Sequence, residues 1–313
     1  MSDGRVDFGI GEGATRLELH GFNIPAKQKR AMSLEAAEQV ANMMVLDPYP
    51  GFESEYFSMP CRNVLPKPRQ KPHPPMWIAC TNRDTIKVAA RNGLGALAFT
   101  FIDPDEARKW SEIYYDIIKS EECVPLGHTV NANIALVTGF SMHHDRATAI
   151  RNGREGFEFF GYALGSLVAT DQKPGRTSLW DDFQATRDPD AEEARVRAAV
   201  DRGDDYSSCI GTPDDARRYV RELADVGVDQ LIFIQQAGRN RHADICSSLE
   251  MFAGEVLPEF RAGRDERDAA KAAELAPYIE QALARKEWMQ PLADDDIPVV
   301  HASREHFKGR ALT

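Results

Sequence analysis

Short apolar segments recur along this chain, and a helical pattern follows nearly every one of them. We interpret the apolar segments as strands at residues 6–10, 76–80, 97–101, 133–138 and 230–234. Most are continuously apolar rather than alternating, which is typical of parallel strands buried on both faces. The order strand, helix, strand therefore predicts an α/β fold in which helices cover a parallel sheet.

Helix signals lie between and after these strands. The predicted helices span residues 32–44, 83–91, 105–119, a stretch from about 145, 213–227, 242–260 and 264–285. Residues 15–26 are expected to form a loop, and residues 49–75 an excursion that contains a short hairpin. Residues 161–206 show no clear strand and are expected to be a partly helical insert.

Composition excludes several functional classes. The net charge of the 313-residue chain is −11, which argues against non-specific binding to nucleic acids or anionic membranes, because both require basic surfaces. No apolar run reaches the roughly 20 residues of a membrane-spanning helix, and the start lacks the apolar core of a secretory signal. The five cysteines are scattered and form no C-x-x-C pair. We therefore expect a reducing, cytoplasmic compartment and no metal cluster.

Small and polar residues follow the predicted strands. In parallel α/β folds the carboxyl ends of the strands form the edge where ligands bind. The candidate site residues at this edge are Gly11, Glu12 and Gly13 after the first strand, Cys80, Thr81, Asn82 and Thr85 after the second, and Gln236 after the last.

Residues 9–14 satisfy the pattern G-x-G-x-x-A. A dinucleotide site of this kind needs a helix that opens directly after the glycines. The expected loop at residues 15–26 argues against that interpretation, and with it against an NAD(P)-dependent dehydrogenase. The alternative is a strand end whose small residues leave room beside a ligand or another stretch of backbone.

In residues 79–85 a strand leads directly into a helix. The unpaired N–H groups of the first helical turn, together with Thr81, Asn82 and Thr85, would suit a monophosphate. The same residues also suit an ordinary helix cap, and Asp84 disfavours a dianion unless its side chain points away. Gln236 is equally open, because its amide would serve either a ligand ring or a turn.

Five motifs, in this order, resemble the luciferase-like family of flavin-dependent monooxygenases. They are GRVDFGIGEG at residues 4–13, PHPPMWIA at 72–79, TIKVAARNG at 85–93, GTPDD through ADVGVD at 211–229, and SLEMF through VLP at 248–258. The resemblance covers about residues 4–262 and implies a (β/α)8 TIM barrel. Segment 6–10 matches the family's fourth strand, so we expect a partial barrel of about strands 4–8 at residues 1–262, with the insert at 161–206, and a C-terminal helix and tail at 263–313.

The resemblance also implies a function. Such proteins use reduced FMN, supplied by a flavin reductase, and O2 to oxygenate a small organic substrate; some branches use the deazaflavin F420 instead. The family's phosphate site falls at Thr81, Asn82 and Thr85 of this chain, and the loop Gly11–Gly13 is expected to border the flavin. A homodimer is implied as well. The aromatic residues in or near the insert, namely Phe157, Phe159, Phe160, Tyr162 and Trp180, are expected to shape access to the pocket.

Two departures from the family pattern bear on activity. Glu12 stands where the family often has an arginine that helps to hold the phosphate. The first three strands, which carry the substrate-facing histidine of the luciferases, are expected to be absent, so no catalytic residue is assigned and the sequence is interpreted as a fragment. A non-catalytic remnant therefore stands beside the oxygenase as an alternative.

Overall fold

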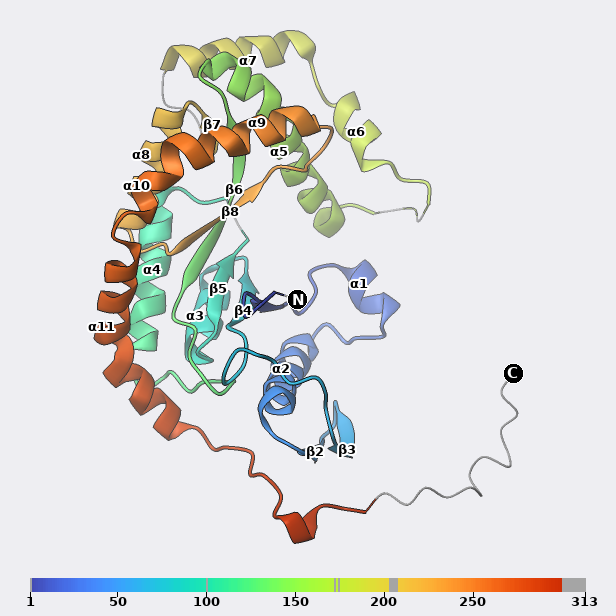
Figure 1. Cartoon of the computed structure of the whole chain (residues 1–313). Coiled ribbons are helices and arrows are strands. Elements are labelled where there is room, and N and C mark those ends of the chain that lie inside the picture. Colours follow the sequence, from blue (N-terminus) through green and yellow to red (C-terminus); the bar gives the residue numbers. More distant parts are fainter. Residues whose placement is uncertain (1, 100, 172, 174, 203–207, 300–313) are drawn as a thin grey trace.

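A curled parallel sheet with helices on its outer side forms the centre of the computed structural model (Figure 1), which describes residues 2–99, 101–171, 173, 175–202 and 208–299. The sheet has the order β1-β4-β5-β6, and both β7 and β8 pair with β6. Its strands are β1 (Phe8–Ile10), β4 (Met76–Cys80), β5 (Gly95–Ala98), β6 (Ile134–Met142), β7 (Cys209–Gly211) and β8 (Gln230–Ile234). Strands β2 (Tyr49–Glu53) and β3 (Ser58–Arg62) form a separate antiparallel hairpin.

The sheet is open, with β1 and β8 at the two ends of the path through β4, β5 and β6. Every pairing within it is parallel. This curled, open arrangement confirms the predicted partial barrel. Among the described residues no helix is long and apolar enough to cross a membrane, and no group of three or more His, Cys, Asp or Glu side chains is placed to hold a metal ion.

Helices follow the strands as the sequence pattern predicted, with several additions. They are α1 (Arg16–Gly21), α2 (Lys29–Val45), α3 (Arg83–Arg91), α4 (Pro104–Ile118), α5 (Arg146–Ala169), α6 (Leu179–Ala185), α7 (Pro189–Arg202), α8 (Pro213–Asp225), α9 (His242–Met251), the π-helical turn η1 (Phe252–Val256), α10 (Leu257–Arg261), α11 (Arg264–Arg285) and the 3-10 turn η2 (Asp294–Asp296).

The core lies between the sheet and the helices on its outer side. All nine residues of β6 are buried, as expected for a central parallel strand covered on both faces. Tyr114 of α4 is fully buried, and its hydroxyl lies 2.8 Å from the Leu94 carbonyl oxygen and 2.9 Å from that of Asn131. These contacts fix α4 against the segments that lead into β5 and β6.

The predicted loop at residues 15–26 was wrong in its first half, because α1 begins at Arg16. Thr15 and Glu18 form a reciprocal capping box: the Thr15 hydroxyl accepts from the Glu18 N–H, and the Glu18 carboxylate accepts from the N–H groups of Ala14 and Thr15. The Thr-x-x-Glu spacing that announces such a box was present in the sequence. Since Glu18 occupies the donors that a pyrophosphate would need, this helix does not revive the dinucleotide interpretation.

The strand predicted at residues 97–101 lies earlier in the chain, at Gly95–Ala98. The chain leaves the ladder after Ala98, where the Phe99 N–H donates to the Cys80 carbonyl oxygen over 2.7 Å. Residue 100 lies outside the described residues. Phe101 is 39% exposed and packs against Phe157 of α5, so its apolar character comes from a contact with a helix and not from a strand.

The insert also differs in detail from the prediction. Helix α5 continues through residue 161 to Ala169, and α6 and α7 follow, which agrees with a partly helical insert. The three-residue strand β7 was missed, because so short a segment shows no periodicity. It pairs with the last three residues of β6, while β8 pairs with β6 from Ala135 to Gly139.

Candidate cofactor site

The loops after β1 and β4 leave the sheet side by side. Phe8 lies opposite Met76 and Ile10 opposite Ile78, in parallel register. The glycine loop after β1 and the Cys80–Thr85 turn after β4 therefore stand at the same edge of the sheet. Seven of the eight candidate residues lie in these two segments.

The start of α3 is closed by a capping box between Asn82 and Thr85. The Thr85 N–H donates to Asn82 Oδ1 over 3.0 Å, and the Thr85 hydroxyl accepts from the N–H groups of Thr81 (3.0 Å) and Asn82 (3.1 Å). Thr85 is itself buried. The Thr85 hydroxyl, proposed from sequence as a ligand group, is thus engaged in holding the turn.

Hydrogen-bond donors remain at the start of α3 in addition to those that the capping box uses. The N–H groups of Arg83 and Asp84, in the first turn of α3, have no carbonyl partner one turn earlier in the helix. The Asp84 side chain is 84% exposed and pairs with Lys87 one turn further along. Among the described residues the Asn82 amide nitrogen makes no hydrogen bond, although its oxygen does. An anion would therefore meet backbone donors and one amide here.

Cys80 lies beneath this turn rather than at its surface. Its side chain is buried, and its Sγ lies 3.4 Å from the carbonyl oxygens of Ile78 and Thr85. Burial raises the pKa of the Cys80 thiol to about 12, so the thiol stays protonated at neutral pH. Cys80 can support the turn by packing, but it is not a nucleophile.

Glu12 forms an ion pair with Arg30 of α2. Arg30 Nη2 lies 2.9 Å from Glu12 Oε1, and Arg30 Nε lies 3.3 Å from Oε2. Its hydrogen bonds to Glu12 are the main cause that raises the Arg30 pKa, with smaller contributions from the negative charges of Glu12 and Asp84. Arg30 is therefore held at the loop after β1, at the edge of the sheet where α3 also begins.

Arg30 is the residue that sequence reasoning missed. It lies 18 positions beyond Glu12, and no local pattern links the two. The acidic residue that departs from the family pattern thus holds a cation brought in by a different element. The only signal in the sequence was Glu12 itself, because its negative charge predicts a positively charged partner.

Gln236 stands apart from the other seven candidates. It is exposed and follows β8, which lies at the opposite end of the sheet from β1. Its neighbour Gln235 is only partly exposed, and Gln235 Oε1 is buried without a hydrogen-bond partner among the described residues. The inward-facing amide at this strand end is therefore that of Gln235.

The aromatic residues predicted to shape access divide between two sides of α5. Phe157 and Phe160 contact Phe101, with ring centroids 4.6 and 5.9 Å apart. Phe159 and Trp180 instead meet edge to face with ring centroids 5.0 Å apart, and Tyr162 packs on Phe183 of α6. Of the five predicted aromatic residues, Phe157 alone is among the described residues that line the small cavity of about 200 Å³ next to Ile210 of β7, together with its partner Phe101.

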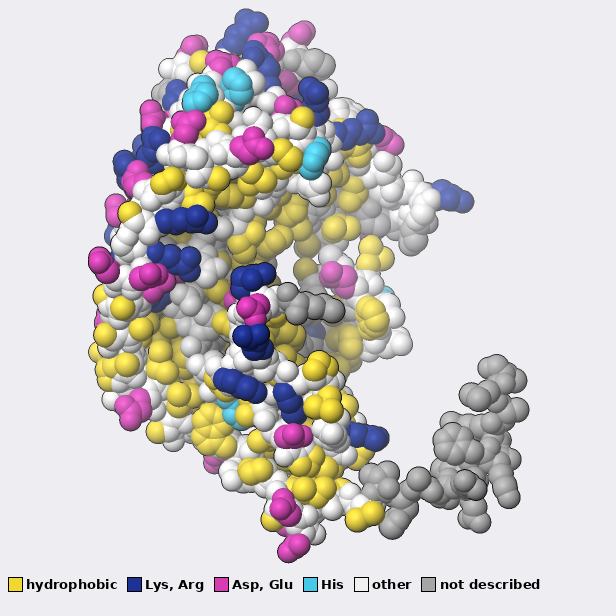
Figure 2. Space-filling model, in the orientation of Figure 1, with side chains coloured by type: hydrophobic (Ala, Val, Ile, Leu, Met, Phe, Trp, Pro, Cys, Tyr) yellow, Lys and Arg dark blue, Asp and Glu magenta, His cyan; other side chains and the backbone are white. Residues whose placement is uncertain are grey.

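The hollow inside the curled sheet is lined by hydrophobic side chains (Figure 2). The Phe157 ring lies directly over Gly139 of β6, where an added Cβ would approach it to 2.7 Å. Arg154 forms a 2.5 Å ion pair with Glu158 at the rim of the small cavity. The hollow therefore offers an apolar wall beside the strand ends that carry the polar candidates.

The chain matches known proteins along most of its length. The family model described as luciferase-like monooxygenase matches residues 1–230. Among curated proteins, the uncharacterized protein y4wF of Sinorhizobium fredii is 31% identical over 93 residues, a match that spans 30% of this chain and 27% of that protein.

Solved structures show the same fold at low identity. The monooxygenase RslO1 from Streptomyces bottropensis aligns with a TM-score of 0.60 at 22% identity, over 83% of this chain and 70% of that one. The oxygenating constituent of 3,6-diketocamphane monooxygenase from Pseudomonas putida, in complex with FMN, aligns with a TM-score of 0.55 at 16% identity, over 82% and 71%. The coenzyme F420-dependent tetrahydromethanopterin reductase from Methanopyrus kandleri aligns with a TM-score of 0.53 at 16% identity, over 83% and 76%. Because the family model covers well over half of the chain, the protein belongs to the family of luciferase-like monooxygenases.

Proposed function

We propose that this chain is the cofactor-binding part of an oxidoreductase that uses reduced FMN and O2 to oxygenate a small organic substrate. The observation that carries the proposal is that Arg30, bound to Glu12 in the loop after β1, and the start of α3 after β4 stand at the same edge of the sheet. A guanidinium next to unpaired helix N–H groups is suited to a phosphate group. Because the protein belongs to the luciferase-like monooxygenases, FMN is the ligand that we expect at this edge.

The residues present fit the phosphate of FMN. The N–H groups of Arg83 and Asp84 and the amide of Asn82 would donate to the phosphate oxygens, and Arg30 would supply the positive charge. The exposed Asp84 carboxylate pairs with Lys87 and so does not oppose the anion at close range. Glu12 competes with the phosphate for Arg30, which makes the Glu12–Arg30 pair the element that sets affinity.

The flavin, when bound, supplies the redox chemistry with O2. The part of the chain is to hold the cofactor and to exclude water from the place where it reacts. Phe101, Phe157 and Phe160 form an apolar wall beside the strand ends, and such a wall lowers the local dielectric and removes competing water. The buried Gln235 oxygen is an acceptor that a ring N–H could use.

A fluorescence titration of the purified chain with FMN tests the proposal, with riboflavin as a matched ligand that lacks the phosphate. We expect saturable FMN binding that Arg30→Gln weakens by about tenfold or more, since a hydrogen bond to a charged group is worth about 1.5–3 kcal/mol. Glu12→Gln should strengthen FMN binding by freeing Arg30. Riboflavin binding should respond to neither substitution, and Arg62→Gln on β3 serves as the charge-matched control.

Two results would contradict the proposal in different ways. FMN binding that is unchanged in Arg30→Gln would place the phosphate elsewhere. No binding of either flavin by a folded chain would favour the non-catalytic remnant. A parallel titration with F420 decides between the two cofactors, because relatives that use each share this fold. Supply of FMN by a flavin reductase, a homodimeric state and a cytoplasmic location stay predictions.

A further inference from the structure

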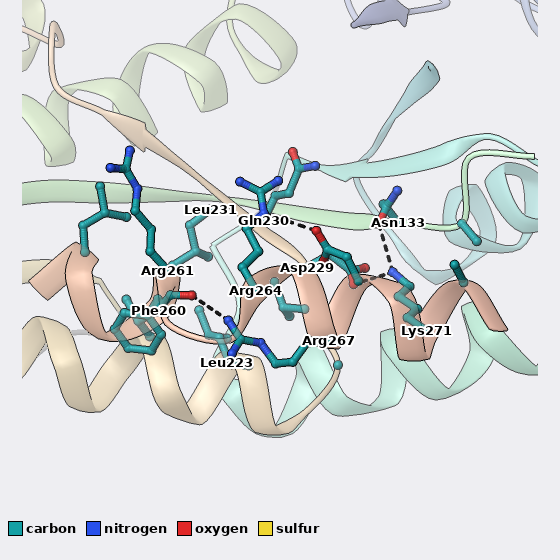
Figure 3. Close-up of a pocket in the computed structure, with 18 of the residues that line it drawn as sticks. Asn133, Leu223, Asp229, Gln230, Leu231, Phe260, Arg261, Arg264, Arg267 and Lys271 are labelled. Carbon is teal, nitrogen blue, oxygen red and sulfur yellow. Dashed lines mark hydrogen bonds and ion pairs between the residues drawn. The ribbon is translucent and has the colours of Figure 1, made fainter. Parts of the chain in front are cut away.

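A second and larger cavity lies on the outer side of the sheet. Its volume is about 980 Å³, and it is lined by α8, the start of β8 and the segment that runs from α10 into α11 (Figure 3). The β8 residues in its wall include Gln230 and Leu231, at the amino end of the strand. The candidate cofactor site lies at the carboxyl ends of β1 and β4, so this cavity is separate from it.

The lining combines two kinds of side chain. Its apolar part includes Val220, Leu223, Leu231, Phe252, Phe260 and Ile279. Its polar part holds four basic residues, Arg261, Arg264, Arg267 and Lys271, against the two carboxylates of Asp229 and Asp268. The difference of 4 − 2 leaves two positive charges in excess, in a chain whose net charge is −11. A positive excess over an apolar floor is unusual on so acidic a protein.

The hydrogen-bond and ion-pair partners of the basic residues show where the excess positive charge lies. Lys271 is satisfied by Asp229 and by Asn133, whose Oδ1 lies 2.9 Å from Nζ. Arg267 donates to the carbonyl oxygens of Phe260 and Ala262, both over 2.6 Å, and pairs with no carboxylate in the part of the chain that the structure describes. Figure 3 shows its bond to Phe260.

Arg261 and Arg264 retain donors that face the cavity. Among the described residues Arg261 makes no hydrogen bond or ion pair, and the Arg264 side chain is 70% exposed and bonds Asp268 only through Nε, over 3.2 Å. Gly263, between these two arginines, has φ +65°, and this left-handed residue turns α10 into α11. Arg261 and Arg264 both line the cavity, one on each side of this turn.

We propose that this cavity binds an amphipathic anion, with an alkyl chain along the apolar floor and a carboxylate head at Arg261 and Arg264. The chemistry of the lining selects both parts, because the floor excludes charged groups and the rim offers the guanidinium donors of two arginines. The volume lies at the upper end of the roughly 300–1,000 Å³ typical of small-molecule pockets. The proposal concerns a second site and does not depend on the proposed oxygenase activity.

Calorimetric titration of the whole chain with decanoate at pH 7.5 tests this site. Decan-1-ol is the matched neutral chain, and butyrate is the matched short anion. We expect decanoate to bind at least about tenfold more tightly than either, because only decanoate satisfies both the floor and the rim. The double variant Arg261→Gln/Arg264→Gln should weaken decanoate binding by about tenfold without changing decan-1-ol binding.

A second variant tests the location independently of charge. Ala272 of α11 is exposed and lines the cavity, so Ala272→Phe fills the space without burying a new polar group. It should weaken decanoate and decan-1-ol alike, whereas Arg62→Gln on β3 should leave both unchanged. Circular dichroism melts verify that every variant is folded.

Three outcomes would overturn the proposal. The first is decanoate binding that survives both the double arginine variant and Ala272→Phe. The second is equal affinity for decanoate and decan-1-ol. The third is a decanoate-free chain whose sedimentation shows a dimer that Ala272→Phe dissociates, since the cavity would then be covered by a second copy.

Discussion

The two end strands of the open sheet, β1 and β8, have different hydrogen-bonding surroundings. At the β1 end, the Gln70 side chain takes the place of a neighbouring strand just before β1: its Nε2 donates to the Val6 carbonyl oxygen over 2.8 Å, and its Oε1 accepts from the Val6 N–H over 3.1 Å. At the other end, β8 pairs only with β6 among the described residues, and Ile232 is 43% exposed. At one end a side chain bonds the backbone just before the last strand, and at the other the last strand has an exposed apolar side chain.

The comparison concerns the bonds that connect each end of the sheet to the rest of the molecule. Around β1, the Glu12–Arg30 pair and a 3.0 Å bond from the Trp77 indole N–H to Asp7 join elements that lie far apart in sequence. Around β8, bonds of this kind gather at Asp229, directly before the strand, which accepts from the Tyr115 hydroxyl and the Ile134 N–H and pairs with Lys271. The strand itself pairs only with β6 among the described residues, and a strand edge left open is prone to pair with another chain. The open β8 edge is thus where we expect the sheet to be weakest.

Amide hydrogen exchange should show the largest difference between the two ends. We expect amides of β8 that do not face β6 to exchange at least about a hundredfold faster than those of the interior strand β4, since open edges exchange through local fluctuations. Mass spectrometry of peptides from each strand measures this. Equal protection of β4 and β8 would mean that the β8 edge is covered in solution.

Acid should weaken the β1 side through His128. Its Nε2 lies 2.9 Å from Asn42 Oδ1 of α2 and its ring stacks on Trp288, and burial lowers the pKa of His128 to about 4. The folded pKa is below the unfolded value of about 6.5, so this contribution is intact above pH 6.5 and is lost as the pH falls through 4. One pKa unit is worth about 1.4 kcal/mol, and for a half-buried ring we expect a discounted loss of about 2 kcal/mol.

Urea unfolding at several pH values measures this loss, with His128→Gln as the comparison. The variant keeps a donor for Asn42 but has no titrating ring, so its free energy of unfolding should fall less between pH 6.5 and 4. Parallel pH profiles for the two proteins would show that other groups cause the acid sensitivity.

Removing the side chain that closes the β1 end should have the smallest effect. Gln70→Ala breaks two solvent-exposed hydrogen bonds to Val6, and we expect it to lower the free energy of unfolding by about 1 kcal/mol. Gln281→Ala, on an exposed face of α11, is the matched control and should change little. A loss no larger than that of the control would remove the distinction drawn between the two ends.

Most of the fold could be predicted from local patterns, because buried strands and capped helices leave signals within a few residues. The strands at 76–80 and 230–234 and the helix at 83–91 lie where the patterns placed them. Helix α1 carried its capping signal in the sequence but was overlooked beside Gly21 and Pro25. The end of β5 was misplaced because an aromatic residue that packs on a helix resembles one buried in a strand.

The site was harder to predict than the fold. Asn82 and Thr85 were identified by their spacing, but that spacing describes a cap as well as a ligand site, and the structure shows the cap. Arg30 and Gln70 act on residues 18 and 64 positions away. Such pairs depend on how α2 and the segment after β3 are placed in three dimensions. A single sequence carries no local pattern from which that placement can be predicted.

Strand β6 is the strand with which both β7 and β8 pair. It holds β8 as far as Gly139 and β7 from Phe140 onward, and the Phe157 ring lies on Gly139, where the partner changes. A molecule that enters the small cavity and displaces Phe157 would push on the one strand to which both β7 and β8 are attached. Displacing Phe157 would therefore act on the pairing of both outer strands at the single residue Gly139.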